Sequence, residues 1–503
     1  MSKQSSLCAI TTSVMWMAYF LIILHVVTGS SVVVPALSSW RDCAEHALTS
    51  GTAALRPPVR GELMQSRRPN PTTHIVATRS RVADLAASAC PGTHQPTLVF
   101  TTIGGFGDRL RGMVTAYYAA LLTHAQFRVS WTVPSPIAPF FDIDPALLWE
   151  EDETRSPDNN AEYAPFATHL AIPGSATVDV IDIFKFFTDP ASDFVTGLAP
   201  PANGTVTVLR TNAPSWIDVV RHPTLRKVAD LYGLTDLSRR DLFVLAVQAV
   251  LRRPAPPVIE AAVMTLPQSL QAPVSSSLAS GFGKGQDYIN VAGGRIHAVP
   301  TKSKAHHHRR GSYALTPSGH PDGDALISDN PATSDNPAPP LAIIGVQIRT
   351  GGVGEAWADA RRHSVNSARC FADRAREVCV DVHAGACFVF LTADSRAAVD
   401  VFVGAMNGTG IGVAQTNGPI LHTDRGVPAS LLSNASTATI TSDPWLKTYA
   451  DWVALSQSDV LLMSHSGYGL TAAWAGGVPH VWQLREGDAC EWVRLDDCAE
   501  LPM

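Results

Sequence analysis

Charged residues are scarce in this 503-residue sequence, and basic residues show no excess. Asp, Glu, Lys and Arg together make up 16% of the chain, and the formal net charge is −6. Proteins that hold nucleic acid through its phosphates need a field of Lys and Arg. Nucleic acid is therefore not an expected partner. A hydrophobic content of 46% is enough for two ordinary domains and additional segments.

Cysteine is also scarce, and no two cysteines have the CxxC spacing of a zinc site. Cys490 and Cys498 are close enough in sequence to form a disulfide, and the group Cys370, Cys379 and Cys387 can supply another. Seven of the eight cysteines follow residue 27, so at least one thiol stays unpaired unless a second chain supplies its mate. A homodimer and buried free thiols are both open alternatives.

The first 29 residues differ from the rest of the chain. Residues 7–27, LCAITTSVMWMAYFLIILHVV, are apolar apart from small hydroxyl side chains and His25, and about twenty such residues can cross a bilayer as a helix. Lys3 precedes this run and Arg41 follows it, which weakly favours a short cytosolic tail. We expect a signal anchor over residues 1–29. A cleaved signal peptide ending near Gly29 is the alternative.

Either alternative places the remainder of the chain in the secretory lumen. Three N-glycosylation triplets, at Asn203, Asn407 and Asn434, agree with this compartment, although such triplets also arise by chance. Residues 30–94 carry scattered Pro, Ser, Thr and Arg without periodicity. We interpret this segment as a stem that holds the body of the protein away from the membrane.

Residues 95–270 show the pattern of an α/β domain. Residues 97–103 form a continuous apolar run, as in a buried parallel strand, and a glycine turn follows. Apolar residues then recur at helical spacing, and residues 127–131 alternate like a strand, which completes a βαβ unit. The segments 206–212 and 241–253 continue the domain as a strand and a helix.

Residues 271–340 change in composition. Ser, Gly, His, Pro and Asp dominate, so we predict a disordered insertion between two domains. Three consecutive histidines at 306–308 have no neighbouring carboxylate or cysteine pattern. We therefore expect a solvated loop there and no metal site.

Residues 341–503 return to alternating strands and helices. Expected strands are 341–348, 387–393, 410–414, 459–465 and 479–484, and expected helices are 367–382, 395–405, 445–458 and 468–475. This order predicts a doubly wound parallel sheet. The architecture is then two α/β domains of Rossmann type that face a cleft.

Ligands of open α/β sheets bind beyond the carboxyl ends of the strands, and three unusual stretches fall there. The first is GGFGDRLRG, residues 104–112, in which Gly104, Gly105 and Gly107 allow close backbone approach at a helix N-terminus. Arg109 lies in the first helical turn, where the helix dipole disfavours a cation. This placement indicates a bound anion or a buried carboxylate nearby. A purely structural glycine turn is the alternative.

The other two stretches also suit an anion. Alternation places Gln347 and Arg349 on one face of a strand end, and an amide beside a guanidinium fork suits a phosphate. Ser466, Gly467 and Tyr468 come after the segment DVLLM, residues 459–463, and open a helix, so they offer hydroxyl and N–H donors. Two donor clusters at neighbouring strand ends fit a diphosphate. For Arg349 the alternative is an interdomain salt bridge.

These motifs together resemble a known family. GGFGDRLRGMVTAYYAALLT is similar to the start of GDP-fucose-dependent fucosyltransferases, and IGVQIRT looks like their arginine motif in the form found in plant xyloglucan fucosyltransferases. SDVLLMSHSGYGLTAAWAGGVPHVW and FLTADS resemble two further segments. Relatives that act on N-glycan cores or protein hydroxyls carry His-x-Arg in place of Gln-Ile-Arg. The motifs cover about a third of the chain and follow the same order.

The resemblance implies an inverting, metal-independent glycosyltransferase of the GT-B type that uses GDP-fucose as donor substrate and no cofactor. Arg349 would neutralise the β-phosphate of the departing GDP, with Gln347 and residues 466–468 assisting. Asp394 matches a position that contacts the guanosine, and Arg109 with the glycine turn would face the donor across the cleft. The implied location is the Golgi membrane, single-pass with a lumenal catalytic domain, or secretion if the N-terminus is cleaved.

Two departures from the family pattern affect the chemistry. Asp108 stands where the family usually has Asn, and two glycines follow QIRT where an acid is expected. Glu355 and Asp359 are candidates for the general base, with surface acids as the alternative. The acceptor, a glycan or a glycoprotein hydroxyl, is not identified. A transferase for another nucleotide sugar, a sulfotransferase and an inactive membrane-anchored glycan-binding or scaffold protein stay open.

Overall fold

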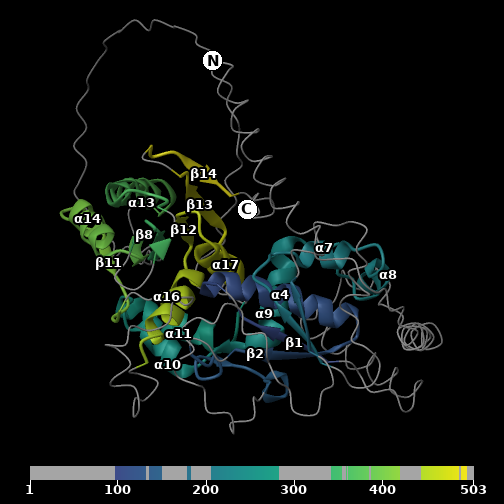
Figure 1. Cartoon of the computed structure of the whole chain (residues 1–503). Helices are drawn as coiled ribbons and strands as arrows, with labels where there is room; N and C mark the ends of the chain where they lie inside the picture. The colour runs from purple at the N-terminus through teal and green to yellow at the C-terminus, as the bar shows by residue number, and fades with distance from the viewer. Residues whose placement is uncertain are drawn as a thin grey trace, which may run out of the picture.

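The structure is a computed structural model of the whole chain (Figure 1). It describes residues 97–102, 104–131, 135–149, 178–182, 206–282, 341–353, 358–359, 361–383, 387–419, 443–486 and 489–495. The predicted anchor, the stem and most of the predicted insertion lie outside these ranges. No helix within them is both long and apolar enough to cross a bilayer.

The N-terminal lobe is built on a four-stranded parallel sheet with the order β2-β1-β5-β4. Besides this sheet and the helices, the lobe contains a short antiparallel pair, β3 with β6, and a 3-10 turn, η2. The elements are β1 (Thr97–Thr101), α4 (Phe106–Leu122), β2 (Gln126–Ser130), β3 (Phe141–Asp142), η2 (Pro145–Leu147), β4 (Val178–Asp182), β5 (Val206–Arg210), α7 (Trp216–Arg221), α8 (Arg226–Leu231), α9 (Arg239–Leu251), β6 (Arg253–Pro254), α10 (Pro256–Val263) and α11 (Gln268–Ala279).

The predicted βαβ unit is confirmed by β1, α4 and β2. The apolar interior of β1 is buried, and α4 is buried on almost every side, so the helix lies inside the lobe. Gly112 allows α4 to pack directly against the backbone at Thr211, because a Cβ at position 112 would lie 1.9 Å from the carbonyl oxygen of Thr211. Serine at position 238 caps α9 through a hydrogen bond from the Asp241 amide, which fixes where that helix begins.

The predicted boundary at residue 270 is wrong. Helix α11 runs through it from Gln268 to Ala279, and the described chain continues to Phe282. Leu278 and Phe282 are buried in the core of the lobe. Polar residues in QSLQAPVSSS conceal this role in the sequence, because only one side of α11 contributes to the core.

The C-terminal lobe is a six-stranded sheet with the order β11-β10-β7-β12-β13-β14. All neighbouring strands are parallel except β13 and β14. A separate antiparallel pair joins β8 and β9. The elements are β7 (Ala342–Ile348), β8 (Gly352–Val353), β9 (Ala358–Asp359), η3 (Val365–Ser367), α13 (Ala368–His383), β10 (Cys387–Ala393), α14 (Arg396–Met406), β11 (Gly412–Ala414), α16 (Leu446–Ser456), β12 (Val460–Met463), α17 (Gly467–Gly476), β13 (His480–Leu484) and β14 (Trp492–Arg494).

Alternate residues of β7 face two different layers of helices. Ile344 and Val346 belong to the core formed with α13 and α14, whereas Ile343 belongs to the core that contains α16 and α17. Every residue of β7 is buried, as expected for the central strand of a sheet covered on both faces. The structure therefore has the α/β class and the doubly wound C-terminal sheet that the sequence predicts.

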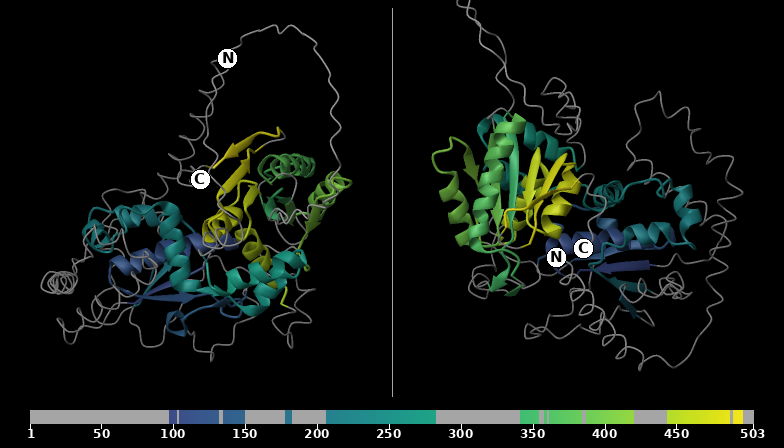
Figure 2. Two further views of the ribbon diagram at one scale, coloured as in Figure 1. Left: turned by 180° about the vertical axis from the view of Figure 1, so that it is seen from behind. Right: turned by 90° about the horizontal axis from the view of Figure 1, so that it is seen from above.

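The two lobes share one hydrophobic core. Helices α16 and α17 lie between the C-terminal sheet and the N-terminal lobe (Figures 1 and 2). Phe106, at the start of α4, contacts Tyr449 and Trp452 of α16 edge-to-face at centroid distances of 5.0 and 5.4 Å. Trp474 of α17 meets Trp216 at 5.8 Å. Two groups of aromatic contacts therefore fix the position of one lobe on the other.

The disulfide pairing differs from the sequence prediction. Cys490 pairs with Cys370, so the predicted Cys490–Cys498 bridge is wrong. The start of α13 and the segment before β14 lie together, since Phe371 also packs edge-to-face on Trp492 at 5.0 Å. Cys379 pairs with Cys387, as the grouping of these cysteines allows.

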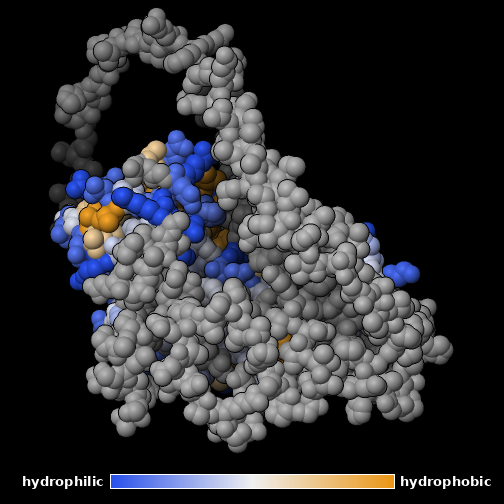
Figure 3. Space-filling view, viewed as in Figure 1, coloured by the Kyte–Doolittle hydropathy of each residue, from blue (hydrophilic) through white to orange (hydrophobic). Residues whose placement is uncertain are grey.

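The described surface of the C-terminal lobe is mainly hydrophilic on the face shown in Figure 3, with a small apolar patch near α14. Asn407 is the exposed C-cap residue of α14, so its glycosylation triplet is accessible. Asn203 and Asn434 lie outside the described residues.

Candidate functional site

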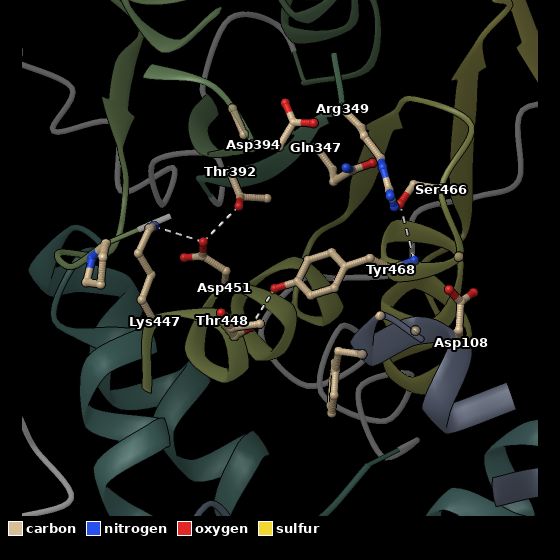
Figure 4. A pocket seen from close by; sticks show the side chains of 16 residues that line it. Asp108, Gln347, Arg349, Thr392, Asp394, Lys447, Thr448, Asp451, Ser466 and Tyr468 are labelled. Carbon is tan, nitrogen blue, oxygen red and sulfur yellow. Dashed lines mark hydrogen bonds and ion pairs between the residues drawn. The ribbon is translucent and has the colours of Figure 1, made fainter. Parts of the chain in front are cut away.

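A cavity lies where the two lobes meet, at the carboxyl ends of β7, β10 and β12 (Figure 4). The N-terminal starts of α4 and α17 close its other side. Its lining comes from both lobes and includes charged and polar side chains: Gly105, Phe106, Gly107, Asp108, Gln347, Arg349, Thr392, Ala393, Asp394, Pro419, Lys447, Thr448, Asp451, Ser466, Gly467 and Tyr468. All three stretches selected from the sequence therefore meet at one site.

Two helix N-termini converge on this cavity. A Cβ on Gly107 would lie 2.4 Å from the carbonyl carbon of Gly467 and 2.5 Å from the amide nitrogen of Tyr468. The first turns of α4 and α17 are thus in backbone contact, which only a residue without a side chain allows. Ser466 is the N-cap of α17, and its hydroxyl accepts a hydrogen bond from the Tyr468 amide at 3.3 Å. The first-turn amides and both helix dipoles make this end of the cavity favourable for an anion.

Arg349 lies directly after β7 and reaches the same end of the cavity. Its guanidinium lies beside Ser466 in Figure 4. Its backbone amide donates to the hydroxyl of Ser464 at 2.8 Å, and the Ser464 amide in turn donates to the carbonyl of Gln347 at 2.9 Å. Ser464 is completely buried. The backbone of Arg349 is therefore hydrogen-bonded to the end of the neighbouring strand β12.

Gln347 is a buried polar residue of the cavity wall, with only 6% of its surface exposed. Its side-chain oxygen is buried and has no hydrogen-bond partner within the described part of the chain. That oxygen lies against α17, because a Cβ on Gly469 would be 3.2 Å from it. The glycine therefore leaves room for the amide of Gln347 next to the helix start.

Asp394 lines the cavity, but its carboxylate already accepts hydrogen bonds from the protein. Both the amide and the hydroxyl of Thr350 donate to Oδ1 at 2.9 Å, and the Gly351 amide donates to Oδ2 at 3.0 Å. Asp394 thus lies at the cavity, while its carboxylate binds the chain that follows Arg349.

Arg109 and Gly104 are behind the cavity wall. Arg109 is 3% exposed, and its guanidinium donates to the carbonyl of Gly104 at 2.7 Å and to the hydroxyl of Thr102 at 2.9 Å. Gly104 has a φ of 82°, in the left-handed region that favours glycine. Arg109 thus binds the carbonyl of Gly104 and stabilises the glycine turn. Gly105 and Gly107 do line the cavity.

Asp108, the departure from the family pattern, faces the cavity from the first turn of α4. Arg111 donates a hydrogen bond to its carboxylate. Both side chains lie against the start of α17, because a Cβ on Gly467 would be 3.2 Å from the Asp108 oxygen and from the Arg111 guanidinium carbon. The pair thus links the two lobes beside the anion-binding end.

Neither candidate for the general base can be placed from its side chain. Glu355 lies outside the described residues. The backbone of Asp359 belongs to β9 and pairs with Gly352, but its side chain also lies outside what the structure describes. Within the described ranges, no three His, Cys, Asp or Glu side chains group as metal ligands.

A buried ionic network, not predicted from the sequence, forms the other end of the cavity. Lys447 and Asp451 are four residues apart on α16, and the ammonium and carboxylate groups are 2.8 Å apart. Asp451 also accepts from the hydroxyls of Thr392, at 2.8 Å, and Thr416. Lys447 donates in addition to the carbonyl and hydroxyl of Thr416 at 3.1 and 2.9 Å. The sequence feature that could have indicated this network is the pair Lys447 and Asp451, four residues apart on the buried side of α16.

Tyr468 separates the two ends of the cavity (Figure 4). Its hydroxyl donates to the carbonyl of Thr448 at 2.5 Å. Burial raises the pKa of this phenol well above its ordinary value, and the charge of Asp451 raises it further. The hydroxyl therefore remains protonated at neutral pH and cannot serve as a base.

No protein-family model and no curated protein sequence matches the chain. Among solved structures, a variant of Arabidopsis thaliana FUT1 in complex with GDP is similar over 92% of this chain and 82% of that chain, with 12% identity and a TM-score of 0.41. The fucosyltransferase NodZ from Bradyrhizobium is similar over 80% of this chain and 99% of that chain, with 12% identity and a TM-score of 0.38. NodZ alpha-1,6-fucosyltransferase co-crystallized with GDP gives the same coverage and identity with a TM-score of 0.37. At these values the likeness does not assign a function, so the functional conclusion depends on the geometry of the cavity.

Proposed function

We propose that this protein is a glycosyltransferase of the GT-B type that transfers fucose from GDP-fucose to a hydroxyl group of a glycan or a glycoprotein. The observation that carries the proposal is the convergence of Arg349 with the N-termini of α4 and α17 on one cavity. These groups come from the three stretches whose sequence resembles fucosyltransferase motifs.

The geometry suits a diphosphate leaving group. As the bond from the sugar to the β-phosphate breaks, negative charge develops on the phosphate and positive charge on the sugar ring. The backbone of Arg349 is fixed by Ser464, and the first-turn amides of α17 are fixed by the helix, so these groups would stabilise this charge with little reorganisation. Removing a single donor of this kind from an enzyme typically lowers kcat by about a hundredfold to a thousandfold.

The reaction we propose is a displacement with inversion at the sugar. The acceptor oxygen bonds to C1 of fucose, the bond from C1 to the β-phosphate oxygen breaks, and GDP leaves with the bonding electrons. The acceptor proton passes to a base, for which Glu355 and Asp359 are our candidates. The cations and helix N-termini of the cavity would fill the role of a metal ion, so we propose a metal-independent reaction.

A second candidate is a nucleotide-sugar-binding protein without transferase activity. It is favoured by the state of the three described carboxylates in the cavity, Asp108, Asp394 and Asp451. Each of them already accepts a hydrogen bond from the protein. Retained nucleotide binding without turnover would support this alternative.

For location we propose the secretory lumen, with residues 1–29 as a Golgi membrane anchor. The two disulfides favour an oxidising compartment, and the accessible triplet at Asn407 is compatible with it. A loss of mass when the expressed chain is treated with an N-glycan-specific glycosidase, smaller in Asn407→Gln than in the wild type, would support this location.

The test of activity uses the full chain in detergent with GDP-fucose and three acceptors, a wall polysaccharide fragment, an N-glycan and a peptide with hydroxyl side chains. Mass spectrometry should show one deoxyhexose added to one of them, and Arg349→Ala should abolish the product. A folded chain that transfers nothing, and that also fails to release GDP, would contradict the enzyme proposal.

A further inference from the structure

The turn after Arg349 is fastened by neighbouring strands on both sides. On one side, the Arg349 amide donates to Ser464 at the end of β12. On the other, Thr350 and Gly351 donate three hydrogen bonds to Asp394 at the end of β10. The Asp394 amide also donates to the carbonyl of Ile348 at 3.1 Å, so the two segments hold each other reciprocally.

The conformation of this turn depends on such support. Gly351 has a φ of 66°, in the left-handed region that side chains disfavour. Thr350 is 5% exposed, and its carbonyl accepts from the Arg362 amide at 2.9 Å. Hydrogen bonds to Ser464, Asp394 and Arg362 therefore hold this turn, and with it the backbone of Arg349, in one conformation.

The carboxylate of Asp394 has little capacity left for a ligand. An ionised carboxylate offers about four acceptor positions, and three are used by Thr350 and Gly351. A guanine ring, which presents adjacent N–H donors, is recognised best by a carboxylate with both oxygens available. That requirement conflicts with the bonds of Asp394, although the resemblance assigns this position to the guanosine.

We propose that Asp394 is a positioning residue, which fixes the turn after Arg349 and thereby aims the guanidinium at the diphosphate, and that it does not recognise the base. The inference rests on the proposed function, since it takes Arg349 as the group that binds the β-phosphate. It predicts that Asp394 affects nucleotide binding only through Arg349.

The test is a double-mutant cycle on the full chain in detergent, measured by calorimetry with GDP and GMP. Asp394→Asn keeps an acceptor for Thr350 but loses one for the Gly351 amide. It should weaken GDP binding by about tenfold and leave GMP, which lacks the β-phosphate, unchanged. In the Arg349→Ala background the same substitution should have no further effect on GDP.

Two controls separate this role from general damage. Asp400→Asn makes the same chemical change at an exposed position of α14 and should leave both affinities unchanged. Thr350→Val removes one hydroxyl donor to Asp394 with little change of shape, and it should weaken GDP without weakening GMP. The unfolding midpoint of each variant shows whether it is folded. If Asp394→Asn does not fold, the comparison of GDP and GMP binding is made with Thr350→Val.

The outcomes are distinct. Equal losses for GDP and GMP, or full additivity of Asp394→Asn with Arg349→Ala, would overturn the positioning role alone and restore a guanosine contact. Folded wild-type protein that binds neither nucleotide would overturn the proposed function and this inference with it.

Discussion

At the scale of single residues, the site depends on glycines as much as on polar side chains. Gly107 allows two helix starts to touch, and Gly469 leaves space for the amide of Gln347. The glycine pattern and the strand-end Arg349 are visible in the sequence, and Gly105, Gly107 and Arg349 line the cavity, whereas Gly104 does not. What the sequence does not reveal is direction. In the sequence, Arg109 is as good a candidate for ligand binding as Arg349. In the structure its guanidinium binds the backbone carbonyl of Gly104 behind the cavity wall. The direction of a guanidinium depends on three-dimensional packing, which the sequence pattern does not show.

Gly107→Ala should destabilise the protein by about 1–3 kcal/mol and weaken nucleotide binding. The added methyl would meet backbone atoms of Gly467 and Tyr468 at 2.4–2.5 Å, so the two helices must separate. Gly404→Ala in α14 is the matched control, because nothing lies within 4 Å of its Cβ and alanine favours a helix interior. The comparison uses chemical denaturation. Equal effects of the two substitutions would contradict the contact between helix starts.

Lys447→Met should cost about 3–5 kcal/mol of unfolding free energy, because it leaves the buried Asp451 without its cation. The exposed pair of Arg396 and Asp400 has the same four-residue spacing, and Arg396→Met should cost less than about 0.5 kcal/mol. Thermal unfolding of both variants checks this. A similar small shift for both would show that the Lys447 network is not structurally important.

At the scale of elements, periodicity predicts the C-terminal lobe well. Each strand and helix expected between residues 341 and 484 is present, with ends within a few residues. Continuous apolar runs and amphipathic segments determine these elements locally. The disulfide of Cys370 with Cys490 could not be predicted this way, since it joins positions 120 residues apart and depends on how β14 lies over α13. The end of α11 was missed because its polar residues hide a narrow buried side.

Removal of the two disulfides should have unequal effects. In the chain-entropy description, closing a loop of 120 residues stabilises by about 5 kcal/mol and a loop of 8 residues by about 2.5 kcal/mol. The double variant Cys370→Ala with Cys490→Ala should therefore unfold at a lower denaturant concentration than Cys379→Ala with Cys387→Ala. The reverse order would indicate that local packing at α13 and β10, and not loop length, determines the effect.

At the scale of the whole molecule, the two lobes meet at a cavity and also share a hydrophobic core. The sequence predicts two α/β units, and the described residues form one parallel four-stranded sheet and one six-stranded sheet that is parallel except for β14. A shared core nevertheless joins the lobes through Phe106 and the aromatic residues of α16 and α17. Sequence periodicity cannot reveal which helices of one unit also bury a face against the other, so this joining was not predicted.

The shared core predicts that both lobes unfold together. Phe106→Ala should lower the unfolding free energy by about 3–5 kcal/mol and leave a single transition, because the residue is 2% exposed and contacts both lobes. Tyrosine and tryptophan fluorescence and circular dichroism should give the same midpoint. Two separate transitions in the wild type would contradict a common core.

The central claim is that Arg349 binds the diphosphate of a guanine nucleotide, and one titration tests it most directly. The full chain in detergent is titrated with GDP, UDP and ADP by calorimetry, beside Arg349→Ala and beside Arg376→Ala, an exposed arginine on α13, as control. We predict selective binding of GDP, a loss of about a hundredfold in Arg349→Ala and no change in Arg376→Ala. Folded protein that treats all three nucleotides alike, or an Arg349→Ala variant that binds GDP as tightly as the wild type, would contradict the account.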